Sequence, residues 1–122
     1  MSEKQIILVV DDTPENIDMI SSLLRQTYKV KAAINGERAL KIAGADVPPD
    51  LILLDIMMPE MDGYEVITRL KADPKTADIP VVFLTADVSA KEKGMSLGAV
   101  DFVTKPIDPN TVQVCVAKIL AG

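Results

Sequence analysis

Residues 6–12, IILVVDD, place five apolar residues directly before Asp11 and Asp12, and residues 51–55, LILLD, place four before Asp55. Neither apolar segment alternates with polar residues, which is typical of strands buried on both faces of a parallel sheet. Both segments are too short to be buried helices. They therefore predict strands of a sheet covered by helices on both faces, with acidic side chains where two strands end.

Apolar segments and amphipathic stretches alternate along the rest of the chain. We expect the other strands at residues 30–34, 81–84 and 100–103. We expect helices from Pro14 with Thr13 as its cap, over 36–45, over 63–72, and from a capping box at 89–92 to Gly98. These units predict an α/β fold with a doubly wound parallel sheet and right-handed crossovers.

The last segment has two readings. Residues 111–116 alternate as a strand would, but a helical spacing of i, i+3, i+4, i+7 and i+8 relates Val112, Cys115, Val116, Ile119 and Leu120. Asp108 at the cap position and Pro109 at the first helical position favour a helix. On that helix Cys115 lies on the apolar face, as a buried inert thiol.

Length and composition restrict the class of protein. The 122 residues suit one domain, spanning 1–122, and a net charge of -5 argues against direct binding of nucleic acid. The chain has no His, which excludes imidazole-based triads and His-ligated metals, and one Cys, which excludes an internal disulfide. No apolar run approaches the roughly 20 residues of a membrane span, so we expect a cytoplasmic location without membrane contact.

Polar side chains follow four of the expected strands. They are Asp11 and Asp12, Asp55, Thr85 and Lys105, and a doubly wound sheet gathers the carboxyl ends of its strands at one edge. Three carboxylates that close together repel one another unless a cation is present. Oxygen ligands without His or thiolate suit Mg²⁺. Such a set, with Lys105 as a second positive charge and Thr85 as a donor, could neutralise a phosphoryl group transferred to Asp55 on the central strand.

Four motifs at specific spacings carry a resemblance to a known family. Asp55 lies 43 residues after Asp12, Thr85 lies 30 further on, and Lys105 another 20. Together the motifs closely resemble the receiver domain of two-component response regulators: Val10-Asp11-Asp12, residues 53–63 (LLDIMMPEMDG), Leu84-Thr85-Ala86 and Val103-Thr104-Lys105-Pro106. The resemblance covers essentially the whole chain. It implies a flavodoxin-like (βα)5 fold with strand order 2-1-3-4-5.

The resemblance also implies a role for each acidic residue. Asp55 matches the phosphoacceptor, which receives a phosphoryl group from the phosphohistidine of a sensor histidine kinase or phosphotransfer protein. Asp12 matches a direct Mg²⁺ ligand, Asp11 a ligand acting through water, and the backbone carbonyl of Met57 the third protein ligand. The family members are signalling switches and not enzymes, apart from Mg²⁺-dependent self-phosphorylation and autodephosphorylation of the aspartate.

The switch residues follow from the same resemblance. Thr85 matches the hydroxyl that moves toward the phosphoryl group, and Phe102 the aromatic residue that turns inward with it. The peptide between Lys105 and Pro106 is cis in the family, which an X-Pro bond permits. Without the resemblance, Phe102 would be a core aromatic residue at a strand end.

Output is expected through the fourth helix, fifth strand and fifth helix, a face that commonly mediates homodimerisation or output contacts in the family. Val114, with Leu97 or Ala117, could add to that face. The output domain or effector is unknown: the chain is either free-standing or cut from a longer protein. Residues 12–16 and 98–107 resemble receivers joined to cyclic-di-GMP enzymes or histidine kinases.

Three other functions compete with the switch. Phosphatases of the haloacid-dehalogenase type share the Asp, Thr and Lys, but need a second Asp where this chain has Met57. A phosphorylation-independent interaction module would leave the acidic site unused. A nucleotide-binding Rossmann domain lacks its G-x-G-x-x-G motif after the first strand.

Overall fold

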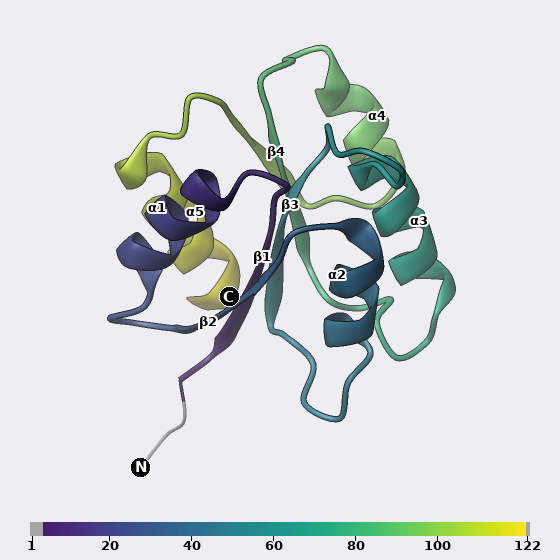
Figure 1. Cartoon of the computed structure of the whole chain (residues 1–122), viewed down its shortest axis with the longest axis horizontal. Helices are drawn as coiled ribbons and strands as arrows, with labels where there is room; N and C mark the ends of the chain where they lie inside the picture. The colour runs from purple at the N-terminus through teal and green to yellow at the C-terminus, as the bar shows by residue number, and fades with distance from the viewer. Residues whose placement is uncertain (1–3, 122) are drawn as a thin grey trace.

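The computed structural model describes residues 4–121, so residues 1–3 and 122 of the expected domain lie outside the described range. Within it, five strands alternate with five helices (Figure 1). The strands are β1 (Ile6–Val10), β2 (Lys29–Ala33), β3 (Leu51–Asp55), β4 (Val81–Thr85) and β5 (Asp101–Thr104). The helices are α1 (Pro14–Leu24), α2 (Gly36–Ala43), α3 (Gly63–Ala72), α4 (Ala90–Ser96) and α5 (Pro109–Ala121).

The strands form one parallel sheet in the order β2-β1-β3-β4-β5, which confirms the expected fold and order. Every residue of β1, β3 and β4 is buried, as their unbroken apolar sequences predict. The edge strand β2 is partly exposed and carries two lysines, which suits an unpaired edge. Pairing of Val10 with Leu54 and of Asp55 with Leu84 brings the carboxyl ends of the central strands level.

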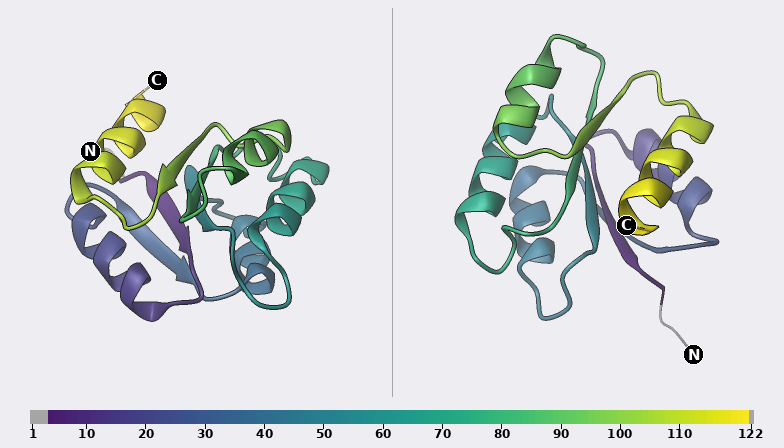
Figure 2. Two further views of the ribbon diagram at one scale, coloured as in Figure 1. Left: turned by 90° about the horizontal axis from the view of Figure 1, so that it is seen from above. Right: turned by 180° about the vertical axis from the view of Figure 1, so that it is seen from behind.

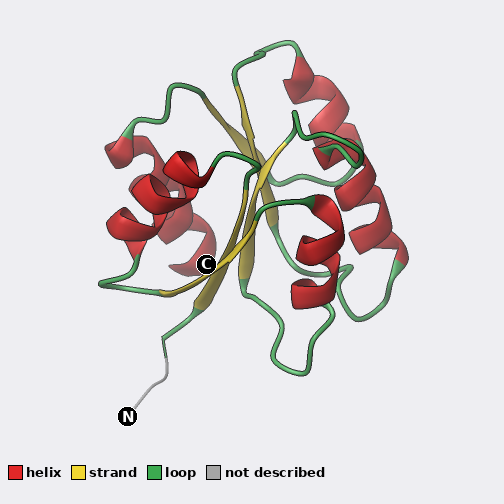
Figure 3. Cartoon of the chain, viewed as in Figure 1, coloured by secondary structure: helices red, strands yellow, loops and turns green. Residues whose placement is uncertain are grey.

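Two layers of helices enclose the sheet (Figures 1 and 3). Helices α1 and α5 cover one face, and α2, α3 and α4 cover the other, as the view from above also shows (Figure 2). Because side chains alternate along a strand, each central strand supplies residues to both cores. The face under α3 buries Leu8, Ile52 and Val66, whereas the face under α1 buries Ile7 and Ile20.

Several boundaries differ from the sequence expectation by one or two residues. Strand β2 begins and ends one residue earlier than expected, and β5 one residue later. The shift in β5 arises because the ladder continues until Thr104 pairs with Thr85 at the end of β4, a tertiary contact that local sequence does not encode. Helix α2 ends at Ala43, and Gly44 serves as its cap.

Two expected side-chain caps are not formed. Thr13 occupies the cap position of α1, but its backbone carbonyl, and not its hydroxyl, accepts the hydrogen bond from the Asn16 N–H. Ser89 before α4 already has a helical backbone, with φ -66° and ψ -17°, so the expected capping box does not exist. The Ser89 hydroxyl donates instead to Asp87 Oδ1, at 2.6 Å, because Asp87 caps this turn.

The last segment is helical, as its capping residues indicated. Val112, Cys115 and Val116 are buried against the sheet, while Val114 is 58% exposed on the opposite side, as expected. Ile119 and Leu120 pack only partly against the core. No helix between residues 4 and 121 has the length and apolar character needed to cross a membrane.

Candidate functional site

Three acidic side chains converge at the carboxyl edge of the sheet. Asp11 follows β1, Asp55 ends β3, and both are buried, whereas Asp12 is exposed. Each offers one carboxylate oxygen, and these three oxygens lie within 4.8 Å of one another. The convergence expected from strand order is therefore confirmed at the level of atoms.

Gly63 allows the loop after β3 to hold Asp55 in place. The Gly63 N–H donates to the carbonyl of Ile56, at 2.8 Å, which folds the start of α3 back onto the end of β3. A Cβ at position 63 would lie 2.6 Å from the backbone oxygen of Asp55. Only glycine permits this close approach without moving the end of β3. The resulting contact holds the backbone of Asp55 in place.

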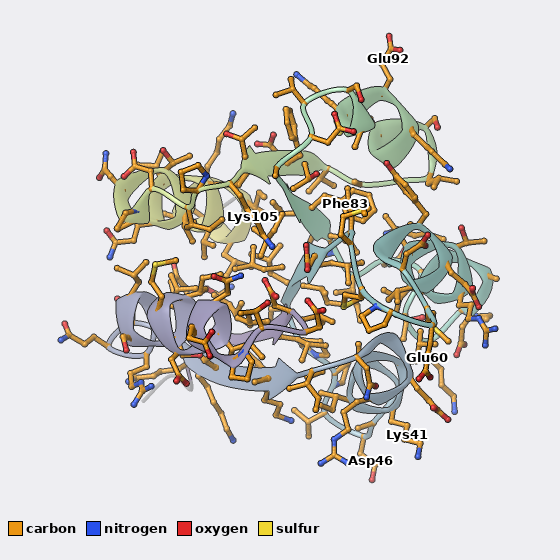
Figure 4. All side chains as sticks on the ribbon, turned by 45° about the horizontal axis from the view of Figure 1, so that its top comes forward. Lys41, Asp46, Glu60, Phe83, Glu92 and Lys105 are labelled. Atoms are coloured by element: carbon orange, nitrogen blue, oxygen red, sulfur yellow. The ribbon has the colours of Figure 1, made fainter. Side chains whose placement is uncertain are left out.

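Lys105 joins two of the carboxylates. Its Nζ lies 3.0 Å from Asp55 Oδ1 and 3.3 Å from Asp11 Oδ2. Figure 4 shows the labelled Lys105 side chain extending from the end of β5 toward the centre of the molecule. The following Lys105–Pro106 peptide is cis, as the family resemblance implied. One ammonium thus opposes three carboxylates, and the site retains a net negative charge.

Burial and charge alter the acidity of the central pair. Burial raises the pKa of Asp55 to about 6; the Lys105 hydrogen bond opposes this rise, and the Asp11 charge adds to it. Burial alone would lower the pKa of Lys105, but its contacts with Asp55 and Asp11 produce a net rise. Lys105 therefore stays protonated and favours the ionised form of Asp55.

Asp11 is held by two donors from the start of α1. Its Oδ1 accepts the Thr13 N–H at 2.9 Å, and its Oδ2 accepts Asn16 Nδ2 at 3.2 Å. The sequence reasoning missed Asn16. A signal was present, because the third residue of a helix often reaches back to the preceding loop, and Pro14 marks the first residue.

Thr85 ends β4 with its hydroxyl engaged by its own loop. Its Oγ1 accepts the Asp87 N–H at 3.0 Å and lies 3.4 Å from the Asp87 carbonyl oxygen. Asp87 is held in turn by the N–H and hydroxyl of Ser89, whose hydrogen bonds lower the pKa of this exposed carboxyl. The Thr85 hydroxyl therefore has its hydrogen-bond partners in the β4–α4 loop.

The two remaining candidate residues differ in their surroundings. Phe102 on β5 is partly buried and packs against the core beneath α3 and α4. Met57 follows β3 with its side chain 75% exposed. Met58 is buried, and Met61 packs against the core.

The donor set fits a hard divalent cation. All three converging groups are carboxylates, and with Lys105 they leave an excess of two negative charges. Two of these carboxylates are buried, so the repulsion among the three is costly, and a doubly charged ion with oxygen preference offsets that cost. The acidic triad is thus consistent with Mg²⁺.

Comparison with protein families and known proteins identifies relatives. A family model described as response regulator receiver domain matches residues 7–117. The "Probable cyclic di-GMP phosphodiesterase" of Vibrio cholerae is 52% identical over 103 residues, which cover 83% of this chain and 23% of that protein. The chain spans less than half the length of the first curated relatives that it matches.

Solved structures agree with this match. A response regulator of Chloroflexus aurantiacus superposes with a TM-score of 0.91 and 34% identity, covering 98% of this chain and all of that one. The receiver domain of a sensor histidine kinase from Pseudomonas aeruginosa gives a TM-score of 0.88 and 27% identity, covering 98% and 99% of the two chains. That structure has a magnesium ion coordinated in its active-site cleft.

Proposed function

The chain belongs to the response regulator receiver domain family, and we propose that Asp55 accepts the phosphoryl group that operates it as a switch. A receiver domain is a signalling module and not an enzyme with a substrate to turn over. The observation that carries the proposal is the buried Asp55 carboxylate beside Asp11 and Asp12, with Lys105 Nζ at 3.0 Å. Because residues 1–122 contain no His, the phosphohistidine must lie outside them, on a sensor histidine kinase or phosphotransfer protein.

The transfer requires the ionised form of Asp55. One carboxylate oxygen attacks the phosphorus, the phosphorus–nitrogen bond breaks, and the electron pair stays on the donor imidazole. Lys105 supports this step twice, because its hydrogen bond keeps Asp55 ionised and its charge can then hold a phosphoryl oxygen. Its contact with Asp11 keeps the ammonium at the sheet edge.

We propose for this acidic triad the metal ligands that the family resemblance implies. Asp12 and Asp55 would bind Mg²⁺ directly, Asp11 through water, and Met57 through its backbone carbonyl. The ion, when bound, neutralises charge on the phosphoryl oxygens and on the carboxylates. Asn16 holds one Asp11 oxygen and the Thr13 N–H the other, so Asp11 stays oriented without the ion.

Phosphorylation would then change the β4–α4 loop. The Thr85 hydroxyl turns its O–H from the Asp87 carbonyl oxygen to a phosphoryl oxygen and gives up the Asp87 N–H as it moves, and Phe102 turns into the space that Thr85 leaves. The face formed by α4, β5 and α5 changes its population between two states and contacts an output domain, an effector or a second copy of the chain. We propose that Val114, which is exposed on α5, adds to this face.

The relatives favour an output domain that belongs to the same, longer protein as the receiver domain. One is named as a cyclic di-GMP phosphodiesterase and is about four times as long as the matched segment. We propose a cytoplasmic module that controls such an output, and no direct contact of this domain with nucleic acid.

Intact mass measurement after incubation with acetyl phosphate, with and without Mg²⁺, tests the proposal. We expect one phosphoryl adduct on the parent chain with Mg²⁺ and none on Asp55→Asn. Asp46→Asn is the matched control, because it makes the same chemical change at an exposed residue in the loop before β3 and should be labelled normally. Equal labelling of Asp55→Asn would overturn the assignment. An unlabelled parent that also fails to bind beryllofluoride would favour the interaction module.

A further inference from the structure

Three aromatic rings lie against the short helix α4. Phe83 of β4 packs beneath Gly94, where a Cβ would lie 2.5 Å from the ring. The other two rings lie beneath lysines: Lys93 Nζ is 4.2 Å from the ring centroid of Tyr64, and Lys91 Nζ is 5.0 Å from that of Phe102. Both distances are within the range of cation–π attraction.

These two lysines are alike in covering an aromatic ring, but the two rings belong to different elements. Both are exposed, and neither takes part in an ion pair among residues 4–121. Tyr64 is fixed on α3, with its ring packed edge-on against Phe83 at 5.8 Å. Phe102 is the residue that the proposed function requires to move.

We propose that Lys91 is a positioning residue that holds Phe102 in its partly exposed orientation until the site is phosphorylated. The inference rests on the proposed function, because it specifies how that switch is kept in its resting state. When Phe102 turns inward, its ring leaves the Lys91 ammonium, and the attraction between them is lost. The contact therefore stabilises the resting state by the free energy of one surface cation–π interaction. This free energy corresponds to about a two- to fivefold change in the ratio of the resting to the activated state.

The same segment of chain also holds Thr85. The Asp87 N–H donates to Thr85 Oγ1, and the Asp87 carbonyl accepts the Ala90 N–H, so the loop leads directly into the first turn of α4. Lys91 is the next residue, and its N–H donates to Val88. A movement that withdraws Asp87 from Thr85 therefore also displaces Lys91 from Phe102. Residues 87–91 hold both switch side chains at once.

Three variants separate this role from a general charge effect. Lys91→Met removes the ammonium but keeps an apolar side chain over Phe102. Lys93→Met makes the same change two residues away, above Tyr64, and is the matched control. Lys91→Arg restores a cation above the ring. The measurement is the affinity for beryllofluoride, a phosphoryl mimic, in excess Mg²⁺, followed by NMR shifts of the Phe102 amide and ring.

We expect Lys91→Met to bind beryllofluoride about two- to fivefold more tightly than the parent, with Phe102 signals shifted toward the bound state before addition. Lys93→Met and Lys91→Arg should match the parent. Equal affinities for Lys91→Met and Lys93→Met, or weaker binding by Lys91→Met, would overturn the role of Lys91 and leave the proposed function standing. A parent chain that binds no beryllofluoride would overturn both.

Discussion

Lys105 Nζ donates to Asp55 Oδ1 across 3.0 Å, although 50 positions separate the two residues in the sequence. The contact exists because β3 and β5 both end at the same edge of the sheet, on either side of β4. Among residues 4–121 it gives Asp55 one cationic neighbour, in a site that holds three carboxylates. Lys105 and a divalent ion both offset the negative charge of these carboxylates, so removing the ammonium should change the affinity for the ion.

Lys105→Met should strengthen Mg²⁺ binding and weaken phosphorylation. Without the ammonium, the full charge of the three carboxylates acts on the ion, so we expect the affinity to rise about 3- to 10-fold. Phosphorylation by acetyl phosphate should slow about 10- to 100-fold, because a donor to the phosphoryl oxygens is lost. Calorimetric titration and intact mass measure the two effects. Lys105→Arg keeps the charge and should leave Mg²⁺ affinity near the parent value; weaker binding by Lys105→Met would contradict this account.

Asp55→Asn should stabilise the metal-free protein in a pH-dependent way. The Asp55 pKa rises from 3.8 to about 6, chiefly through burial, so the folded chain holds its proton where the unfolded chain has lost it. The contribution of Asp55 to the stability of the parent therefore falls as pH rises from 3.8 to about 6, and this loss is complete above that. We expect the free energy of unfolding of the Asn variant to exceed that of the parent by about 1–3 kcal/mol at neutral pH. This difference should vanish near pH 3.8, where both chains carry a neutral side chain at position 55.

Urea unfolding of both chains in chelator, at a series of pH values, measures this difference. Saturating Mg²⁺ provides the control, because the ion stabilises only the chain with the intact carboxylate and should remove the advantage of Asn. If the free energies of unfolding of the two chains differed by the same amount at every pH, titration of Asp55 would not be the cause of the difference.

Much of this molecule was predictable from sequence, because its central strands are apolar throughout and its acidic residues follow them directly. The unbroken segments at β1, β3 and β4 indicated a parallel sheet, and a parallel sheet gathers the residues that follow its strands. Asp11, Asp12, Asp55 and Lys105 were located in this way. The strand order came from the family motifs, since periodicity alone does not specify neighbours.

The contacts that sequence did not predict depend on loop geometry and side-chain reach. The 89–92 segment has the residues of a capping box, but Asp87 accepts the Ser89 hydroxyl, and the backbone of Ser89 is already helical. Lys91 reaches Phe102 only because α4 lies over β5, which no local pattern encodes. The exposure of Met57 is likewise set by the path of the loop after β3.

Gly94→Ala should destabilise the protein by about 1–3 kcal/mol, because the added methyl group would lie 2.5 Å from the Phe83 ring and force α4 outward. Gly44→Ala is a matched control. Position 44 has a negative φ, and its Cβ would meet only the Leu40 carbonyl oxygen, at 3.4 Å, so that variant should unfold close to the parent temperature. Thermal unfolding followed by circular dichroism compares the two. Equal midpoints for the variants would show that α4 does not pack closely on Phe83.

Cys115 should be nearly inert toward alkylating reagents in the folded chain. Burial raises the pKa of its thiol from 9.0 to about 11, and Asp101 adds to the rise through its charge and a contact of 3.7 Å with the sulfur. At about pH 8 the thiolate fraction is then about a hundredfold lower than for a free cysteine, and alkylation by iodoacetamide should slow at least as much. Intact mass over time measures the rate.

The raised pKa of the Cys115 thiol also makes the stability of the protein depend on pH in the alkaline range. Between pH 9.0 and about 11 the unfolded chain loses the thiol proton while the folded chain keeps it. The contribution of Cys115 to stability should therefore fall as pH rises. Cys115→Ala has no thiol and should not show this contribution. Asp101→Asn removes the negative charge beside the sulfur and should speed alkylation about 3- to 10-fold, with Asp108→Asn, exposed at the start of α5, as its control. Alkylation of the folded parent at the rate of a free cysteine would contradict the burial of this thiol against the sheet.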